Sequence, residues 1–323
     1  MVRQTYFITH YYHSGFSVAC EDTLLVFDYW RGEKGELAEK HQIHPDFLKC
    51  FSHVFVFISH EHIDHMDPVV FTWRDIGNVN YIVSSDMPVG TRGKRMAPGD
   101  TLTLTDDIIV TAYDSTDLGV SFLVDFKGFS VFHAGDLNYW HWRDESTLRE
   151  IENAESEFRK AVAPLCKEQI DLAFFPVDPR QGAMFEAGAN YFILSVKPRL
   201  FIPMHYFHRV DVAIEYARIA GCRSTEVLAM PGYGDTIRLE IDEEGYFNIS
   251  FPEMESLLET MKATKTAEKS NQQEDPETER THDSNPFDES DLPLPQLVNE
   301  IHPEEAGALQ ETTDREKDKE QPN

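Results

Sequence analysis

Positive charge is scarce in this chain. Its 323 residues include 29 Lys and Arg against 57 Asp and Glu, which gives a formal net charge of −28. A body of this sign repels a phosphate backbone, so we expect no nucleic-acid partner. The densest basic cluster is formed by Arg92, Lys94 and Arg95, and it is small for a polyanion site.

Long apolar runs and paired cysteines are also missing. No run of 18 apolar residues occurs, and residues 1–6 lack the apolar centre of a secretory leader. The four cysteines lie far apart with no C-x-x-C pair, which predicts reduced thiols rather than a disulfide framework. We therefore expect a soluble, cytoplasmic protein with no membrane partner, and the sequence leaves an oligomer possible.

The chain does contain one dense cluster of metal ligands. His60, His62, Asp64 and His65 spell H-x-H-x-D-H directly after the apolar run 54–59. Neutral imidazole and carboxylate suit zinc, manganese or iron, and no thiolate is present to favour one of them. The apolar run is typical of a buried strand, which places the motif in the loop at the carboxyl end of that strand.

Short β-like runs dominate the first half of the chain, and strands alternate with helices in the second. The spacing predicts strands near residues 6–8, 16–19, 24–27, 54–59, 81–83, 101–104, 108–112, 120–124, 129–132, 172–175 and 200–202, and helices over 146–165 and 186–196. This order predicts an α/β fold, a four-layer αββα sandwich of two mixed β-sheets.

The composition changes near residue 255. Aromatic residues almost vanish after it, and Glu, Asp, Thr, Lys, Gln and Pro dominate to the end of the chain. We expect one catalytic domain over residues 1–254 and an acidic disordered tail over 255–323, because such a segment cannot bury enough apolar surface to order itself. Residues 292–298 are mildly apolar, which fits a short docking motif or an inert part of the tail.

Two further candidate ligands each follow a strand-like run. Asp136 follows Val131–Phe132 and a glycine, and His205 follows Phe201–Ile202. Because strand ends of one sheet meet at the same edge, these side chains are expected to converge on the loop of residues 60–65.

These motifs together resemble the metallo-β-lactamase superfamily, and in particular the branch of L-ascorbate-6-phosphate lactonase-like hydrolases. The resemblance runs in order from residue 5 to about residue 240 and includes Tyr12-His13-Ser14-Gly15-Phe16, which is similar to the Gly-His-Ala-type segment of that branch. It implies that His60, His62 and a third-motif ligand hold one metal, that Asp64, His65 and His205 hold the other, and that Asp136 bridges the two. It also implies that Asp28 orients a ligand from outside the metal shell, with His13 and His133 nearby.

One motif of that family is altered here. Its third motif is a histidine before the bridging aspartate, and the matching stretch, residues 111–119, contains none. Asp117 is our first candidate for this ligand and Asp114 its rival, while a water or His133 are the remaining options. His133 lies three residues before Asp136, so a regular strand would turn it to the opposite face.

Three residues are candidates for contacts with a substrate. Trp140 follows the bridging aspartate in an aromatic segment and is expected either in a pocket wall or in the core. Arg180 lies in a loop after a strand, where it could bind an anionic group or form a surface ion pair. His208 could donate a proton to a leaving group or be a surface residue.

The pattern therefore predicts a metal-dependent hydrolase for a small-molecule ester, lactone, amide or phosphodiester. Two divalent metal ions would activate water, with zinc expected first and manganese or iron as alternatives, and Asp64 would accept the proton from that water. A di-iron redox enzyme of the same fold usually needs Glu in place of His62, and a nuclease needs basic surface. A degenerate metabolite-binding protein with weak or no catalysis is the remaining alternative.

Overall fold

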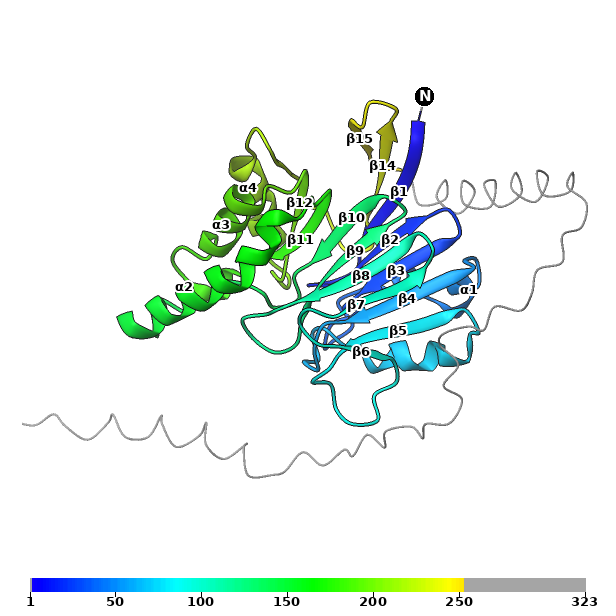
Figure 1. The fold of residues 1–323 in the computed structure, drawn as a ribbon, viewed down its shortest axis with the longest axis horizontal. Coiled ribbons are helices and arrows are strands. Elements are labelled where there is room, and N and C mark those ends of the chain that lie inside the picture. Colours follow the sequence, from blue (N-terminus) through cyan, green and yellow to red (C-terminus); the bar gives the residue numbers. More distant parts are fainter. Residues whose placement is uncertain (1, 253–323) are drawn as a thin grey trace, which may run out of the picture.

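Two mixed β-sheets lie face to face, with helices on their outer sides (Figure 1). The computed structural model describes residues 2–252. The predicted acidic tail, the docking motif at 292–298 and the domain boundary at 254 lie outside the described residues. The predicted fold class, an αββα sandwich, is confirmed by this arrangement.

The first sheet has eight strands and comes from both ends of the described chain. Its order is β15-β14-β1-β2-β3-β4-β5-β6. The strands are β1 Val2–His10, β2 Phe16–Cys20, β3 Thr23–Phe27, β4 His53–Ile58, β5 Val79–Ser84, β6 Lys94–Met96, β14 Thr236–Asp242 and β15 Phe247–Ser250. β3, β4 and β5 are parallel, so their carboxyl ends share one edge.

The second sheet has seven strands in the order β13-β12-β11-β10-β9-β8-β7. The strands are β7 Thr101–Thr105, β8 Ile108–Tyr113, β9 Ser121–Phe126, β10 Phe129–His133, β11 Leu172–Pro176, β12 Leu200–Met204 and β13 Glu226–Val227. β9 and β10 form the hairpin expected across Lys127 and Gly128. β10, β11 and β12 are parallel, and their carboxyl ends also meet at one edge.

Strand β4 shows why its apolar run is continuous rather than alternating. Phe55 and Phe57 point into the core between the two sheets. Val54 and Val56 pack on the other side, in a second core beneath the outer helical layer. Both faces of the strand are therefore buried, as expected for the parallel part of a sheet.

The longer helices cover the second sheet (Figure 1). They are α2 Leu148–Val162, α3 Ala187–Val196 and α4 Val210–Ala220, and the short α1 Pro45–Leu48 lies by the first sheet. Thr147 and Glu150 form a capping box at the start of α2, which satisfies two backbone groups that a helix end leaves unpaired. The predicted helix 146–165 continues beyond α2 only as a 3-10 turn, Ala163–Lys167, because Pro164 cannot donate to the helical ladder.

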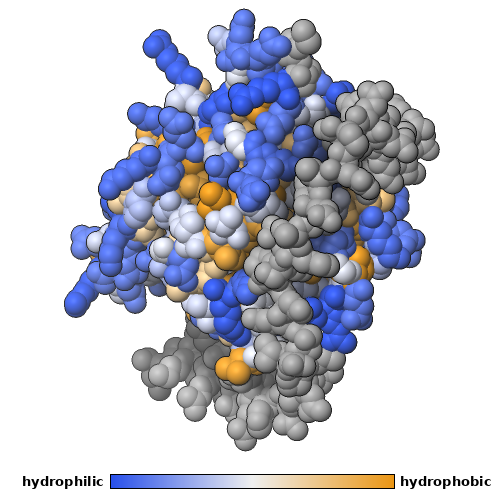
Figure 2. All heavy atoms as spheres, turned by 45° about the vertical axis from the view of Figure 1, so that its right-hand side comes forward, coloured by the Kyte–Doolittle hydropathy of each residue, from blue (hydrophilic) through white to orange (hydrophobic). Residues whose placement is uncertain are grey.

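The surface is largely polar, as the acidic composition predicts. On the face shown in Figure 2, hydrophilic side chains predominate and apolar ones show in the gaps between them. None of the helices within residues 2–252 is both long and apolar enough to cross a membrane.

Candidate metal centre

Histidine and aspartate side chains from both sheets converge between the strand ends. Three groups of them place ligand atoms within 4.8 Å of one another. We call their members the His/Asp cluster: His13, His60, His62, Asp64, His65, Asp117, Asp136 and His205. The residues predicted from the H-x-H-x-D-H motif, together with Asp136 and His205, are thus brought together.

Asp136 lies at the centre of this cluster. Its Oδ1 atom is 3.0 Å from Nε2 of His65 and 3.0 Å from Nε2 of His205. Its Oδ2 atom is 3.3 Å from Nε2 of His60. Burial raises the pKa of this carboxyl, but the neighbouring His65 and His205 outweigh it and hold the pKa well below its usual range. One carboxylate therefore faces three imidazoles, as a bridging ligand would.

Within the described chain, the atoms that point into the cluster make close ion-pair contacts with one another but no well-directed hydrogen bond. They include Nε2 of His65, Nε2 of His205 and Oδ1 of Asp136, all of them buried. Buried polar atoms are normally satisfied, and the exceptions call for an explanation such as an ion. Imidazole nitrogens and a carboxylate oxygen aimed at one point have the donor chemistry of a site for a transition-metal cation.

The imidazoles are held from behind by a carboxylate at the end of β3. The Oδ1 and Oδ2 atoms of Asp28 accept hydrogen bonds from the backbone N–H and hydroxyl of Ser59, at 2.8 and 2.6 Å. Nδ1 of His65 lies 2.7 Å from Oδ2 of Asp28. This carboxylate is buried, which raises its pKa, yet the charges of His133 and His65 lower the pKa overall. The structure thus places Asp28 behind His65, and its role in orienting a metal ligand stays a prediction.

The ring of His60 is also oriented through its Nδ1 atom, but by a hydroxyl group instead of a carboxylate. Its Nδ1 lies 3.0 Å from the hydroxyl oxygen of Ser59, whose own proton is directed to Asp28. We infer that Nδ1 of His60 donates to that oxygen, which leaves its Nε2 without a proton. Nε2 faces His62 and Asp136, so the neutral imidazole presents a lone pair to the cluster.

His13 lies against the cluster but is turned differently. Its Nδ1 accepts a hydrogen bond from the backbone N–H of Phe207, at 3.2 Å. Burial, and then the nearby His205, lower the pKa of His13 well below its usual value, so the ring is neutral and its one proton sits on Nε2. That atom is 3.4 Å from Oδ2 of Asp64. In this state Nε2 directs its proton toward Asp64. The same nitrogen forms no hydrogen bond within the described residues and belongs to the group of Asp64, His65 and His205.

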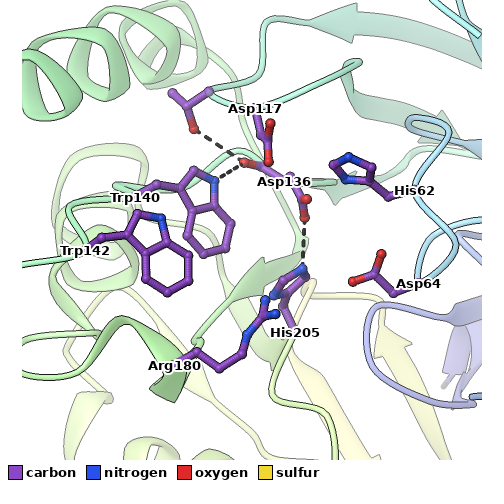
Figure 3. Close-up of a pocket in the computed structure, with 9 residues that line it drawn as sticks. His62, Asp64, Asp117, Asp136, Trp140, Trp142, Arg180 and His205 are labelled. Atoms are coloured by element: carbon purple, nitrogen blue, oxygen red, sulfur yellow. Dashed lines mark hydrogen bonds and ion pairs between the residues drawn. The ribbon is translucent and has the colours of Figure 1, made fainter. Parts of the chain in front are cut away.

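Three residues were candidates to replace the histidine that is missing from the third motif, and the structure places them differently. Asp117 forms a group with His62 and Asp136, and its side chain faces the same pocket (Figure 3). Asp114 is exposed, and its Oδ1 accepts from the backbone N–H of Ser115. His133 is buried beneath the site, with Nε2 2.8 Å from the carbonyl oxygen of Ser14. Of the three candidates, the structure brings Asp117 to the site.

Backbone strain gathers at the same place. His13, Asp28 and His205 have φ of 55°, 41° and 65°. Residues other than glycine adopt this left-handed region rarely, at a cost of order 1–3 kcal/mol each. Strain of this kind concentrates at functional sites, where the surrounding packing enforces it.

The cluster opens into a pocket of about 400 Å³ (Figure 3). Its lining residues are His62, Asp64, Thr116, Asp117, Asp136, Trp140, Trp142, Arg180 and His205. Trp140 and Arg180 therefore lie where a substrate would contact them. His208 is exposed and is not among these lining residues, so its predicted substrate contact gains no support.

No protein-family model matches the chain. A UPF0173 metal-dependent hydrolase of Heliobacterium modesticaldum is 28% identical over 173 residues, which are 47% of this chain and 65% of that protein. The chain thus spans less than two thirds of that relative's length.

Solved structures match over more of the chain. YhfI of Bacillus subtilis, a metallo-β-lactamase fold protein, matches with a TM-score of 0.46 at 13% identity, covering 77% of this chain and 100% of that one. The metallo hydrolase Igni18 of Ignicoccus hospitalis matches with a TM-score of 0.52 at 17% identity, covering 74% of this chain and 100% of that one. The chain therefore shares its fold of two facing mixed sheets with Igni18.

Within this fold, Asp178 is a site residue that the sequence did not reveal. It follows β11, and its Oδ2 lies 3.0 Å from Nδ1 of His205. Burial raises its pKa, but hydrogen bonds with His205 and Arg180 outweigh this and lower the pKa to about 2. Asp178 thus stands to His205 as Asp28 does to His65. The rule that acids at strand ends join a site, applied to Asp28 and Asp136, would have found it.

Proposed function

We propose that the protein is a metal-dependent hydrolase that uses two divalent cations to cleave a small-molecule ester, lactone, amide or phosphodiester. The observation that supports it most is the set of buried atoms of His65, Asp136 and His205 that crowd together at 3.0 Å without forming well-directed hydrogen bonds. Zinc is the metal we expect first, because imidazoles outnumber carboxylates among the proposed ligands, with manganese or iron as alternatives.

The proposed ligands divide into two sets that share Asp136. We assign His60, His62 and Asp117 to the first set and Asp64, His65 and His205 to the second, as the resemblance implies. In the structure, Asp136 groups with His62 and Asp117 and also with His60 and His65, while Asp64, His65 and His205 group with His13. Asp28 and Asp178 fix the rings of His65 and His205 through their Nδ1 atoms. Carboxylates in this outer position raise the basicity of a ligand imidazole and hold its orientation.

Two bound divalent cations would lower the pKa of water toward neutrality and polarise the bond to be cleaved. The chain's own residues supply position and proton transfer. We assign Asp64 as the group that accepts the proton of the attacking water. Burial raises the pKa of Asp64, but the hydrogen bond with His13 and the charge of His65 outweigh it and keep the pKa below its usual range. The carboxylate is therefore ionised and able to accept.

The size and charge of the site support a small substrate. The pocket is of the volume that small-molecule sites commonly have. The chain carries a net charge of −28, which disfavours the nuclease alternative. A metabolite-binding protein with weak or no catalysis has one observation in its favour, the exposed Asp117 where the family has histidine.

Metal analysis combined with an activity panel tests the proposal. The protein is loaded with zinc, manganese or iron, its metal content is measured, and hydrolysis of lactones, carboxylic esters, amides and phosphodiesters is assayed. We expect about two metals per chain and cleavage in one substrate class. Asp136→Asn should lose both, whereas Asp211→Asn, which removes an exposed carboxylate paired with Arg209, should lose neither. Fewer than one metal per chain with no hydrolysis would overturn the proposal in favour of the degenerate scaffold.

A further inference from the structure

Arg180 is the cationic side chain that lines the pocket. The other lining residues include three carboxylates, Asp64, Asp117 and Asp136, and no Lys or second Arg. The Arg180 side chain lies in the 3-10 turn after β11 and is 49% exposed. In Figure 3 it extends toward His205 and the open part of the site.

Two contacts fix the guanidinium of Arg180. Its Nε and Nη2 donate to Oδ2 of Asp178 at 2.9 and 2.6 Å. Its central carbon lies 4.5 Å from the centre of the Phe207 ring, a cation–π contact. A guanidinium held in this way is preorganised, so little conformational entropy is lost when it binds a further group.

Part of the guanidinium remains available to a ligand. Both contacts with Asp178 use the Nε–Nη2 edge. Within the described residues, Nη1 has no hydrogen bond. A guanidinium donates five hydrogen bonds in a planar fork, so the second edge of Arg180 can bind an oxyanion with two parallel bonds.

The electrostatics of the loaded site would favour such an anion. Two divalent cations would offset the charges of the three lining carboxylates and of Asp178. Asp28 lies buried behind His65, so the charge of Arg180 would face the open pocket. Charge of one sign inside a cleft acts at short range, where the net charge of the whole protein is screened by salt.

Two indoles form an apolar wall of the same pocket. The rings of Trp140 and Trp142 are stacked, with centroids 5.9 Å apart and planes within 11°. Nε1 of Trp140 donates to the backbone oxygen of Asp136 at 2.8 Å, which fixes that ring beside the cluster. Both rings are only partly buried and line the pocket, so they offer a flat surface to a planar or apolar group.

We propose that the substrate carries a carboxylate or phosphate that does not react, that Arg180 binds this oxyanion, and that Trp140 and Trp142 contact the apolar body of the same molecule. The inference rests on the proposed hydrolytic function, because it describes the substrate of that site. It narrows the substrate class to small anionic esters, lactones or amides.

Binding of a matched pair of ligands tests the inference without turnover. Phenylacetate and phenylacetamide have the same shape and differ in charge. Their affinities for the zinc-loaded protein are measured by calorimetry, with benzylphosphonate as a phosphate-like third ligand. We expect Arg180→Gln to weaken phenylacetate by about 10- to 100-fold, as loss of charge-assisted hydrogen bonds predicts, and to leave phenylacetamide unchanged. Of phenylacetate and benzylphosphonate, the ligand with the higher affinity identifies the preferred oxyanion.

Controls separate this role from a structural one. Arg143 is exposed near the site and bonds Met184 rather than lining the pocket, so Arg143→Gln removes the same charge and should change neither affinity. Arg180→Lys keeps the charge beside Asp178 and should recover part of the phenylacetate affinity. Metal content is measured for each variant. If a substitution at position 180 broke the contact between Asp178 and His205, the metal content would fall.

The outcomes are distinct from those of the proposed function. Equal affinity of phenylacetate for the wild type and Arg180→Gln, or no measurable binding to the wild type, overturns the inference whatever the hydrolysis panel shows. An equal loss for both ligands in Arg180→Gln also overturns it and assigns Arg180 to positioning Asp178. If a substrate is found, Arg180→Gln should lower kcat/KM for the anionic substrate more than kcat/KM for the neutral ester of the same molecule.

Discussion

The Oδ2 atom of Asp28 lies 2.7 Å from Nδ1 of His65, and the other nitrogen of that ring lies 3.0 Å from Asp136. The ring is thus held between a carboxylate that orients it and a carboxylate that would share its metal. Burial lowers the pKa of His65, but Asp136 and Asp28 outweigh it and raise the pKa well above its usual value. A cation entering the site must therefore displace a proton that both carboxylates hold in place.

Asp28→Asn should weaken metal binding without removing a ligand. The amide keeps the shape but cannot accept from all three donors that Asp28 now binds, two from Ser59 and one from His65. Loss of such an outer partner typically costs about 10- to 100-fold in metal affinity. Competition with a metal-sensitive dye measures it. Asp46→Asn, which changes an exposed carboxylate paired with Lys49, is the matched control, and equal affinities in the two variants would contradict the assignment.

Asp117→Asn and Asp114→Asn should differ in metal content. Asp117 groups with His62 and Asp136, whereas Asp114 faces solvent. We expect Asp117→Asn to bind about one metal per chain tightly, because the first ligand set loses an anion, and Asp114→Asn to bind as the wild type does. Elemental analysis after dialysis against a weak chelator gives the ratio. The assignment fails if Asp114→Asn loses metal and Asp117→Asn keeps it.

His13→Gln should show whether this ring is a ligand or a donor. Its Nε2 carries the proton directed at Asp64, and a glutamine amide can also donate. We expect the variant to keep its full metal content, with affinity lowered about 10-fold, the low end of the range for outer partners, because the glutamine amide can still donate. Cobalt substitution offers a second measurement, since the visible spectrum changes when a nitrogen ligand is lost. A drop to one metal per chain would instead make His13 a ligand.

Much of the architecture was predictable from local pattern. The run of residues 54–59 predicted β4, and the burial of this strand on both faces explains why it carries no polar alternation. The strand-end rule located Asp28, Asp136 and His205. The periodicity of apolar residues does not show which strands are neighbours in a sheet. The strand order, which places β14 and β15 beside β1, could therefore not be predicted from it.

The orientation of side chains within the site could not be predicted from the sequence. Nothing in the segment Tyr12–Phe16 shows that the backbone N–H of Phe207, almost two hundred residues later, sets the protonation of His13. Likewise, Arg180 was equally compatible with a surface ion pair. The structure gives it both roles at once, because its Nε–Nη2 edge binds Asp178 while the side chain lines the pocket.

Removal of metal should lower the thermal stability of the folded domain. The unpartnered atoms of His65, Asp136 and His205 gain partners when a cation binds. A ligand present at about 100 times its Kd stabilises the folded state by about 2.7 kcal/mol, which for a domain of this size shifts Tm by about 5–10 °C. Scanning calorimetry with and without zinc checks this. Magnesium should give a smaller shift, because it prefers oxygen ligands, and equal shifts would contradict a histidine-rich site.

Gly119→Ala should destabilise the protein more than Gly128→Ala, although both glycines have nearly the same backbone. Their φ values are 78° and 80°. An alanine in this left-handed region destabilises the folded state by about 1–2 kcal/mol at either position. A Cβ on Gly128 meets nothing within 4 Å, whereas one on Gly119 overlaps the backbone oxygen of Ser59.

Overpacking of that kind adds about 1–3 kcal/mol to the loss in Gly119→Ala. It also displaces Ser59, which donates to Asp28 and contacts Nδ1 of His60, so metal affinity should fall in this variant and be unchanged in Gly128→Ala. Urea denaturation of the metal-free proteins gives the stability difference, and dye competition gives the affinity. Equal losses of stability would show that the loop before β9 can move away from Ser59, and the close approach would then not be needed to hold His60.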